Sequence, residues 1–129
     1  MSFLYRISKT IRWEAAHQLK NLAEDHPCAR LHGHSYSADI VLRSEFLDET
    51  GFVLDYNVLK TVRDMLDHQN LNDIMEANPT AENIAAFIFS VVVDILRRIE
   101  ADSEVFVESV RVRETESTWA EVTVAKPAT

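Results

Sequence analysis

The chain has 129 residues, an apolar fraction of 47% and a formal net charge of −8. This length is enough to bury one core, and we expect residues 1–129 to form a single domain. The negative charge argues against nucleic acid as a partner. The longest apolar run, from Ile84 to Ile95, is interrupted by Ser90 and Asp94, which excludes a membrane-spanning helix.

The cysteine count and the N-terminus indicate the compartment. Cys28 is the only cysteine, so no disulfide can form within the chain. The first residues lack a charged region followed by an apolar stretch, and therefore do not predict a signal peptide. Both observations favour the cytoplasm.

The first half of the chain predicts two strands. Residues 3–17 and residues 32–46 alternate between apolar and polar positions. The polar residues 18–31 between them form a connection that is too long for a tight hairpin turn. Residues 48–51 are a turn.

The second half predicts two helices and a hairpin. Asp55 should cap a helix over residues 56–67, which ends in a turn over residues 67–72. Thr80 should cap a second, strongly apolar helix. Two further strands are expected over residues 104–115 and 118–125. The order β-β-α-α-β-β predicts an α+β domain, with two helices on one face of a four-stranded antiparallel sheet whose edges are free to pair with other chains.

Three histidines occupy inward-facing positions of the first two strands. His32 and His34 share the parity of the apolar residues that follow them, and His17 continues the apolar parity of the first strand. If these strands pair, three imidazoles converge, and three nitrogen ligands with no fourth protein ligand are typical of a catalytic zinc. A lone histidine beside a core is usually a satisfied polar group, but that reading explains three of them poorly.

Other side chains have a structural and a functional reading. Cys28 is a small buried hydrophobe or a reactive thiol four residues before His32. The adjacent Asp67 and His68 are a solvated helix end or a carboxylate–imidazole pair that moves protons. Glu114 shares the inward parity of the preceding valines, so its carboxylate needs a partner inside the fold.

Six short segments occur in order over nearly the whole chain. They are Ala15-Ala16-His17, Cys28-x-x-x-His32-Gly33-His34, Gly51-Phe52-Val53-Leu54-Asp55-Tyr56 with Leu59-Lys60, Leu66-Asp67-His68 with Leu71-Asn72, Pro79-Thr80-x-Glu82-Asn83, and Arg113-Glu114-Thr115. The set resembles the 6-pyruvoyltetrahydropterin synthase and 6-carboxytetrahydropterin synthase family. Trp13 and the segment after Thr115 depart from the family's usual pattern.

The resemblance implies a tunnelling fold, in which sheets join edge to edge into a barrel and two trimers stack as a homohexamer with active sites near subunit interfaces. It implies Zn²⁺ held by His17, His32 and His34, and 7,8-dihydroneopterin triphosphate as substrate. The roles that it implies for other residues are a general base at Cys28, a proton relay at His68 with Asp67, a pterin anchor at Glu114, and a substrate contact at Thr80. Lys20 and Arg30 are the candidates for holding the triphosphate.

The short spacing between Cys28 and His32 resembles the carboxy-forming branch of the family. That branch implies 6-carboxy-5,6,7,8-tetrahydropterin as product, with release of triphosphate and acetaldehyde, in queuosine and other 7-deazapurine pathways. One alternative is the pyruvoyl-forming enzyme, which releases triphosphate only. An alternative of another class is a structural zinc closed by four protein ligands, in a non-catalytic pterin-binding or scaffolding module.

Overall fold

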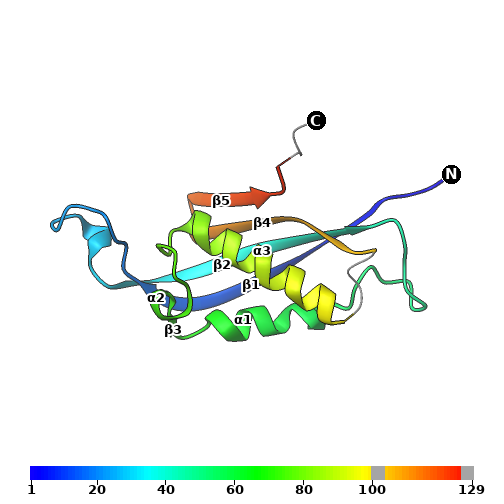
Figure 1. The fold of residues 1–129 in the computed structure, drawn as a ribbon, viewed down its shortest axis with the longest axis horizontal. Helices are drawn as coiled ribbons and strands as arrows, with labels where there is room; N and C mark the ends of the chain where they lie inside the picture. The colour runs from blue at the N-terminus through cyan, green and yellow to red at the C-terminus, as the bar shows by residue number, and fades with distance from the viewer. Residues whose placement is uncertain (100–103, 126–129) are drawn as a thin grey trace.

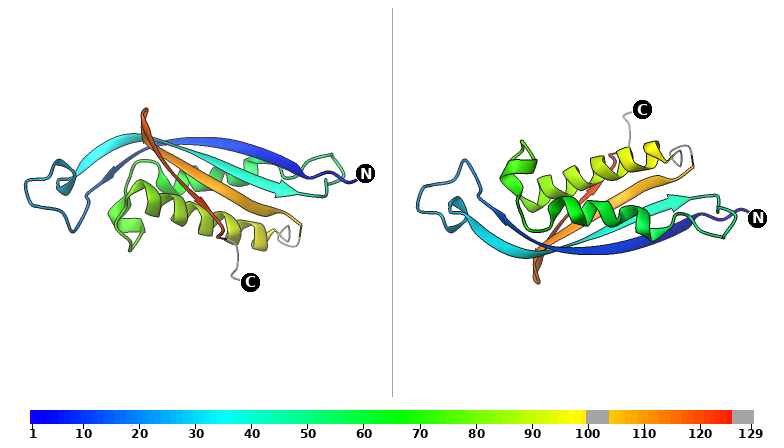
Figure 2. Two further views of the ribbon diagram at one scale, coloured as in Figure 1. Left: turned by 90° about the horizontal axis from the view of Figure 1, so that it is seen from above. Right: turned by 90° about the horizontal axis from the view of Figure 1, so that it is seen from below.

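Two long antiparallel strands carry the structure, a computed structural model that describes residues 1–99 and 104–125 (Figure 1). The strands are β1 (Tyr5–His17), β2 (His32–Ser44), β3 (Gln69–Asn70), β4 (Phe106–Thr115) and β5 (Thr118–Thr123), in the sheet order β3-β1-β2-β4-β5. The helices are α1 (Lys60–Leu66), α2 (Leu71–Ile74) and α3 (Ala81–Arg98), with 3-10 turns η1 (Pro27–Ala29) and η2 (Tyr56–Leu59). Figure 2 shows α1 and α3 on one face of the curved sheet, so the expected α+β architecture is confirmed.

The predicted alternation of β1 and β2 is confirmed by burial. The two strands pair without interruption from Tyr5 opposite Ser44 to His17 opposite His32. Residues of one parity, including Trp13 and Tyr36, are buried beneath the helices, whereas residues of the other parity face away from them. The three histidines lie at one end of this face, where β1 ends at His17 and β2 begins at His32.

The two predicted helix caps are present. The Thr80 hydroxyl accepts a hydrogen bond from the backbone N–H of Asn83 (3.2 Å) at the start of α3. Asp55 accepts from the backbone N–H of Asn57 (2.9 Å), but the turn that it caps is η2, and the α-helix begins only at Lys60. The buried face of α3 then packs against β4 and β5.

The expected four-stranded sheet is wrong by one short strand. Residues 67–72, predicted as a turn, contain β3 and the start of α2. β3 pairs in parallel with Ala15 and Ala16 of β1. Two residues cannot display a period-two pattern, so the sequence carries no signal for this strand.

The connection over residues 18–31 extends beyond the end of the sheet (Figure 1). Its single 3-10 turn, η1, carries Cys28. Within residues 1–99 and 104–125, no helix has the length and apolarity needed to cross a membrane.

Candidate metal centre

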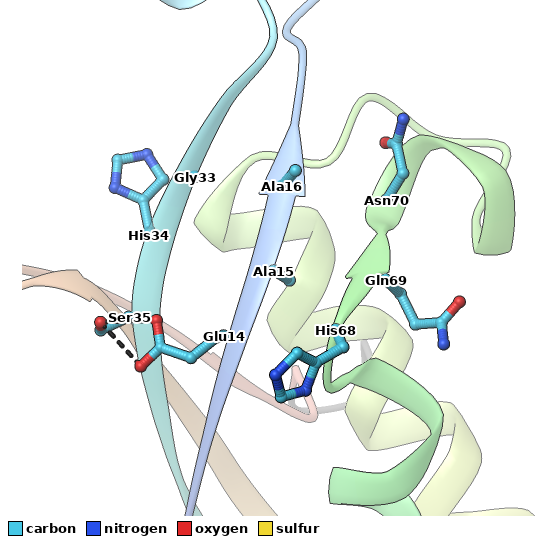
Figure 3. A pocket seen from close by; sticks show the side chains of 9 residues that line it. All are labelled: Glu14, Ala15, Ala16, Gly33, His34, Ser35, His68, Gln69 and Asn70. Carbon is cyan, nitrogen blue, oxygen red and sulfur yellow. Dashed lines mark hydrogen bonds between the residues drawn. The ribbon is translucent and has the colours of Figure 1, made fainter.

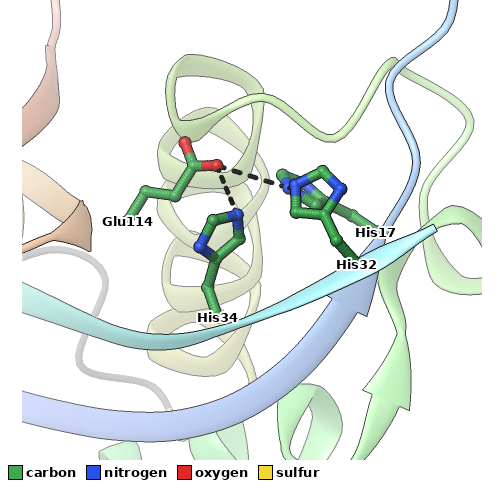
Figure 4. Close-up of side chains that lie close together, drawn as sticks. All are labelled: His17, His32, His34 and Glu114. Carbon is green, nitrogen blue, oxygen red and sulfur yellow. Dashed lines mark hydrogen bonds and ion pairs between the residues drawn. The ribbon is translucent and has the colours of Figure 1, made fainter. Parts of the chain in front are cut away.

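The strand register brings the three histidine rings together. His17 is the partner of His32 across β1 and β2, and His34 lies two residues further along the same face. The ring centroids are 4.5 Å apart for His17 and His32, 5.0 Å for His17 and His34, and 4.8 Å for His32 and His34. Figure 4 shows the rings and the Glu114 side chain directed toward one another.

Two backbone carbonyls fix the protonation of two of these rings. Nδ1 of His17 is 2.7 Å from the Pro79 carbonyl oxygen, and Nδ1 of His32 is 2.7 Å from that of Arg30. A carbonyl can only accept, so each Nδ1 donates and each neutral ring presents a lone pair at Nε2. Those two Nε2 atoms are 2.9 Å apart. Two facing lone pairs repel unless a cation lies between them, and this arrangement therefore fits a metal ion.

The third ring has a buried nitrogen with no hydrogen-bond partner. Nε2 of His34 makes no hydrogen bond within the part of the chain that the structure describes. Burial lowers the pKa of His34, against an opposing effect of the Glu114 carboxylate, and so favours the neutral imidazole that a metal needs. Oε1 of Glu114 lies 2.9 Å from this nitrogen but outside hydrogen-bond geometry, and the two form an ion pair only when the ring is protonated.

Glu114 makes the donor set larger than expected. Its Oε1 is also 3.3 Å from Nε2 of His17, and the four ligand atoms all lie within 4.8 Å of one another. Ligands at about 2.0–2.1 Å from a tetrahedral zinc are about 3.3 Å apart, which is close to the individual contacts of 2.9 Å and 3.3 Å in this group. The expectation that no fourth protein ligand lies nearby is therefore wrong. Glu114 lies here because it is the residue after Arg113, which pairs with Ser37 of β2.

Cys28 is near this centre in sequence but is not part of the donor group. Among the described residues, the converging set consists of the three histidines and Glu114. The thiol is half-buried, and the backbone N–H of Cys28 donates to Nδ1 of His26 (3.1 Å). A half-buried side chain on a loop is not the fully buried hydrophobe of the structural reading.

Asp67 and His68 form the expected pair but lie on the other side of β1. Asp67 Oδ2 is 3.0 Å from Nδ1 of His68 and 3.2 Å from the Arg63 guanidinium. Asp67 Oδ1 accepts from the backbone N–H of Glu14 (2.9 Å), while the backbone N–H of His68 donates to the Glu14 carbonyl (2.6 Å). The His68 side chain is 81% exposed, and Figure 3 shows its ring separated from that of His34 by β1 and β2.

The Asp67 contacts predict a pH-dependent contribution to stability. Hydrogen bonding by the Glu14 N–H, with His68 and Arg63 adding to it, holds the pKa of Asp67 below its usual value. Such a group stabilises the fold above the pKa of the unfolded chain, about 3.9, and loses this effect as pH falls through the lower folded value. We expect Asp67→Asn to lower the free energy of unfolding at pH 7, with a difference from the wild type that shrinks below about pH 4. Urea unfolding at both pH values measures this, and a difference that grows in acid contradicts it.

A shallow groove of about 540 Å³ lies along β1, between β2 and β3. Its lining residues are Glu14, Ala15, Ala16, Gly33, His34, Ser35, His68, Gln69 and Asn70 (Figure 3). A Cβ on Gly33 would meet only the Ala15 carbonyl, at 3.5 Å, so no contact within the chain requires glycine there. The volume is in the range of small-molecule sites, and the groove includes the exposed His68 ring.

The remaining predicted contacts are dispersed. Lys20 and Arg30 are exposed on the 18–31 connection, and the Thr80 hydroxyl caps α3. The residues that sequence reasoning missed are those acting through their backbone, namely the carbonyls of Pro79 and Arg30 that orient His17 and His32. A backbone contact leaves no residue-type signal, so the sequence could not have shown it.

Comparison with known proteins decides the family. The family model described as 6-pyruvoyl tetrahydropterin synthase matches residues 6–125. The chain belongs to the 6-pyruvoyl tetrahydropterin synthase family. Its α+β architecture is the tunnelling fold, since the 6-pyruvoyl tetrahydropterin synthase of Caenorhabditis elegans superposes with a TM-score of 0.78 over 96% of this chain and 98% of that one, at 23% identity.

Two curated relatives are more similar in sequence. The 6-carboxy-5,6,7,8-tetrahydropterin synthase of Synechocystis is 41% identical over 67% of this chain and 74% of its own length. The dihydroneopterin monophosphate aldolase of Pyrococcus furiosus is 42% identical over 66% of this chain and 68% of its own length. Members this similar to the chain thus carry names for two different reactions.

Proposed function

We propose that this protein is a zinc-dependent lyase that converts 7,8-dihydroneopterin triphosphate to 6-carboxy-5,6,7,8-tetrahydropterin, releasing acetaldehyde and triphosphate, in queuosine or other 7-deazapurine biosynthesis. The observation that carries the proposal is the convergence of three imidazole Nε2 atoms, two of them 2.9 Å apart with their lone pairs facing. The Synechocystis relative and the three-residue spacing between Cys28 and His32 support the carboxy-forming branch.

His17, His32 and His34 would hold the zinc in this proposal. Zinc at this position supplies a Lewis acid that lowers the pKa of a bound substrate hydroxyl and stabilises developing negative charge. The carbonyls of Pro79 and Arg30 keep two of the rings in the tautomer that presents Nε2.

The other residues bind substrate or move protons. Cys28 removes a proton from the substrate side chain at its sulfur, and His68, oriented by Asp67, relays protons. Glu114 binds the amino and ring N–H edge of the pterin, because a carboxylate accepts two parallel hydrogen bonds. Thr80 contacts the substrate, and Lys20 and Arg30 bind the triphosphate. In this arrangement Glu114 turns from the histidines to the pterin when substrate is bound.

The position of His68 supports an assembly. Its ring lies across β1 from the histidines of its own chain, so we infer that it serves the centre of a neighbouring copy in a homohexamer, a dimer of trimers. Within the described residues, β3 covers only Ala15 and Ala16 of β1, and β5 forms the other edge of the sheet. Both edges can pair with another copy.

Light scattering tests the assembly. We expect a mass near six times that of the 14.8 kDa chain at micromolar concentration. A species of 14.8 kDa contradicts the proposal. The net charge of −8 supports a protein with no nucleic-acid partner, and we propose a cytoplasmic enzyme that acts without a membrane.

Two other reactions remain as alternatives, namely the pyruvoyl-forming reaction and an aldolase reaction. The Pyrococcus relative favours the second, because its name describes cleavage of a carbon–carbon bond in a related substrate. A non-catalytic zinc module is the alternative of another class, and Glu114 close to the three histidines is the observation that favours it.

Product analysis separates these functions. Purified zinc-loaded protein is incubated with dihydroneopterin triphosphate and, in a separate reaction, with dihydroneopterin monophosphate. Acetaldehyde, free triphosphate or phosphate, and the pterin mass are measured together. The proposal predicts all three signals, with a pterin that has lost two side-chain carbons. Triphosphate without acetaldehyde indicates the pyruvoyl-forming reaction. Cleavage of dihydroneopterin monophosphate without free phosphate indicates an aldolase, and no turnover of either substrate favours the non-catalytic module.

A further inference from the structure

Two asparagine side chains hold the segment over residues 18–20, where the chain leaves β1. Asn72 accepts from the backbone N–H of Gln18 (2.8 Å) and donates to its carbonyl (2.8 Å). Asn78 accepts from the backbone N–H of Lys20 (2.8 Å) and donates to its carbonyl (3.1 Å). Each amide therefore bonds the N–H and the C=O of one residue, as the backbone of a paired strand would. This requires one acceptor and one donor on the same side chain.

The opposite side of this segment is bonded to the turn that carries Cys28. The backbone N–H of Leu19 donates to the Cys28 carbonyl (2.9 Å), and Nε2 of Gln18 donates to the Ala29 carbonyl (2.8 Å). Residues 18–20 thus lie between the asparagine amides and η1. The segment therefore links the two asparagine side chains on one side to the backbone of Cys28 on the other.

The loop that carries Asn78 also contacts a histidine of the metal centre. Pro79, which follows Asn78, orients His17 through its carbonyl. The Asn78 carbonyl accepts from Nδ2 of Asn83 (2.8 Å) near the start of α3, which fixes this loop on the longest helix. One short segment, residues 78–79, therefore contacts both the 18–31 connection and His17.

We propose that Asn72 and Asn78 are positioning residues, which fix the thiol of Cys28 relative to the three histidines. The inference rests on the proposed function for the role of the thiol. The 18–31 connection has little secondary structure of its own, so contacts outside it must set where Cys28 lies. Placement is decisive for a catalytic group, since a misplacement of about 1 Å can cost about 10²-fold in rate.

Asn78→Asp tests this with a side chain of the same size. The carboxylate still accepts from the Lys20 N–H, but its second oxygen faces the Lys20 carbonyl and repels it. We expect faster deuterium exchange over residues 18–31 and faster alkylation by iodoacetamide of Cys28, the only cysteine. Zinc content should stay at the wild-type level, while kcat falls about 10- to 100-fold with little change in KM. Asn72→Asp should change the same quantities in the same direction.

Asn57→Asp is the matched control. Asn57 is exposed in η2, and its side chain makes no hydrogen bond in residues 1–99 or 104–125. The substitution introduces the same charge without losing a hydrogen bond, so exchange over residues 18–31, alkylation and kcat should match the wild type. The inference is overturned if Asn78→Asp leaves exchange unchanged, or if it speeds exchange while kcat equals that of Asn57→Asp. If the wild-type protein turns over no pterin, the proposed function fails, and equal alkylation rates in Asn78→Asp and Asn57→Asp would then separately overturn the positioning of the thiol.

Discussion

Replacing His32 with alanine is expected to abolish zinc binding and turnover together. The substitution removes one of three imidazole ligands, and because Glu114 binds the pterin in the proposed centre, only His17 and His34 are left to hold the ion. A metal held at 100 times its dissociation constant stabilises the native state by about 2.7 kcal/mol. We therefore expect added zinc to raise the Tm of the wild type and to leave that of His32→Ala unchanged. Metal analysis after dialysis against a chelator should find one zinc per wild-type chain and almost none in the variant.

His26→Ala is the control for this prediction. His26 lies outside the converging group, and its ring accepts a hydrogen bond from the Cys28 backbone. It should keep the full zinc content. Full zinc occupancy in His32→Ala would show that the metal is not held by the three histidines together, and would contradict their assignment as the ligand set.

Replacing Cys28 with alanine should have the second largest effect. A general base typically contributes about 10²–10⁴-fold to a rate, and we expect kcat to fall by that factor. The thiol is half-buried and outside the donor group, so zinc content should be unchanged and the free energy of unfolding should fall by about 1 kcal/mol or less. Steady-state kinetics, metal analysis and urea unfolding on one preparation separate these quantities.

Leu22→Ala provides the comparison within the same connection. Leu22 is 39% exposed and has no role in the proposed chemistry. Its turnover should equal that of the wild type. A Cys28→Ala variant with native turnover would mean that another group removes the proton.

The histidine cluster could be predicted because it depends on strand parity alone. His17, His32 and His34 each continue an apolar line, and antiparallel pairing of two consecutive strands is the simplest topology. The structure places all three on one face, where His17 is buried and His32 and His34 are partly exposed. The pattern could not reveal which ring nitrogen faces the centre, because that is decided by the carbonyls of Pro79 and Arg30, of which Pro79 is far away in sequence.

The approach of Glu114 could be predicted only in part. Its parity with Val110 and Val112 indicated an inward side chain, and both valines are fully buried. Its distance to the histidines depends on the register between β2 and β4, which shifts between Val41 and Leu42. An irregularity of this kind moves every later pair along the strand and leaves no periodic signal in the sequence.

The location of Asp67 and His68 depends on two hydrogen bonds to the backbone of Glu14, which no sequence pattern shows. The pair binds both backbone groups of Glu14 at the edge of β1, with His68 in the left-handed region at φ 59°. This conformation is uncommon for a residue other than glycine. These bonds hold the end of α1 against β1 and direct the His68 ring away from the histidine cluster of its own chain and toward solvent.

X-ray absorption at the zinc edge tests the metal centre most directly. The account predicts one zinc per chain, surrounded by histidine nitrogens and further light atoms at about 2.0–2.1 Å, with no sulfur at about 2.3 Å. Glu114→Gln should keep the zinc and this histidine shell, because the three imidazoles are sufficient to hold the ion. A sulfur neighbour at about 2.3 Å, or loss of the zinc from Glu114→Gln, would contradict an open centre of three histidines and indicate a closed site with four protein ligands.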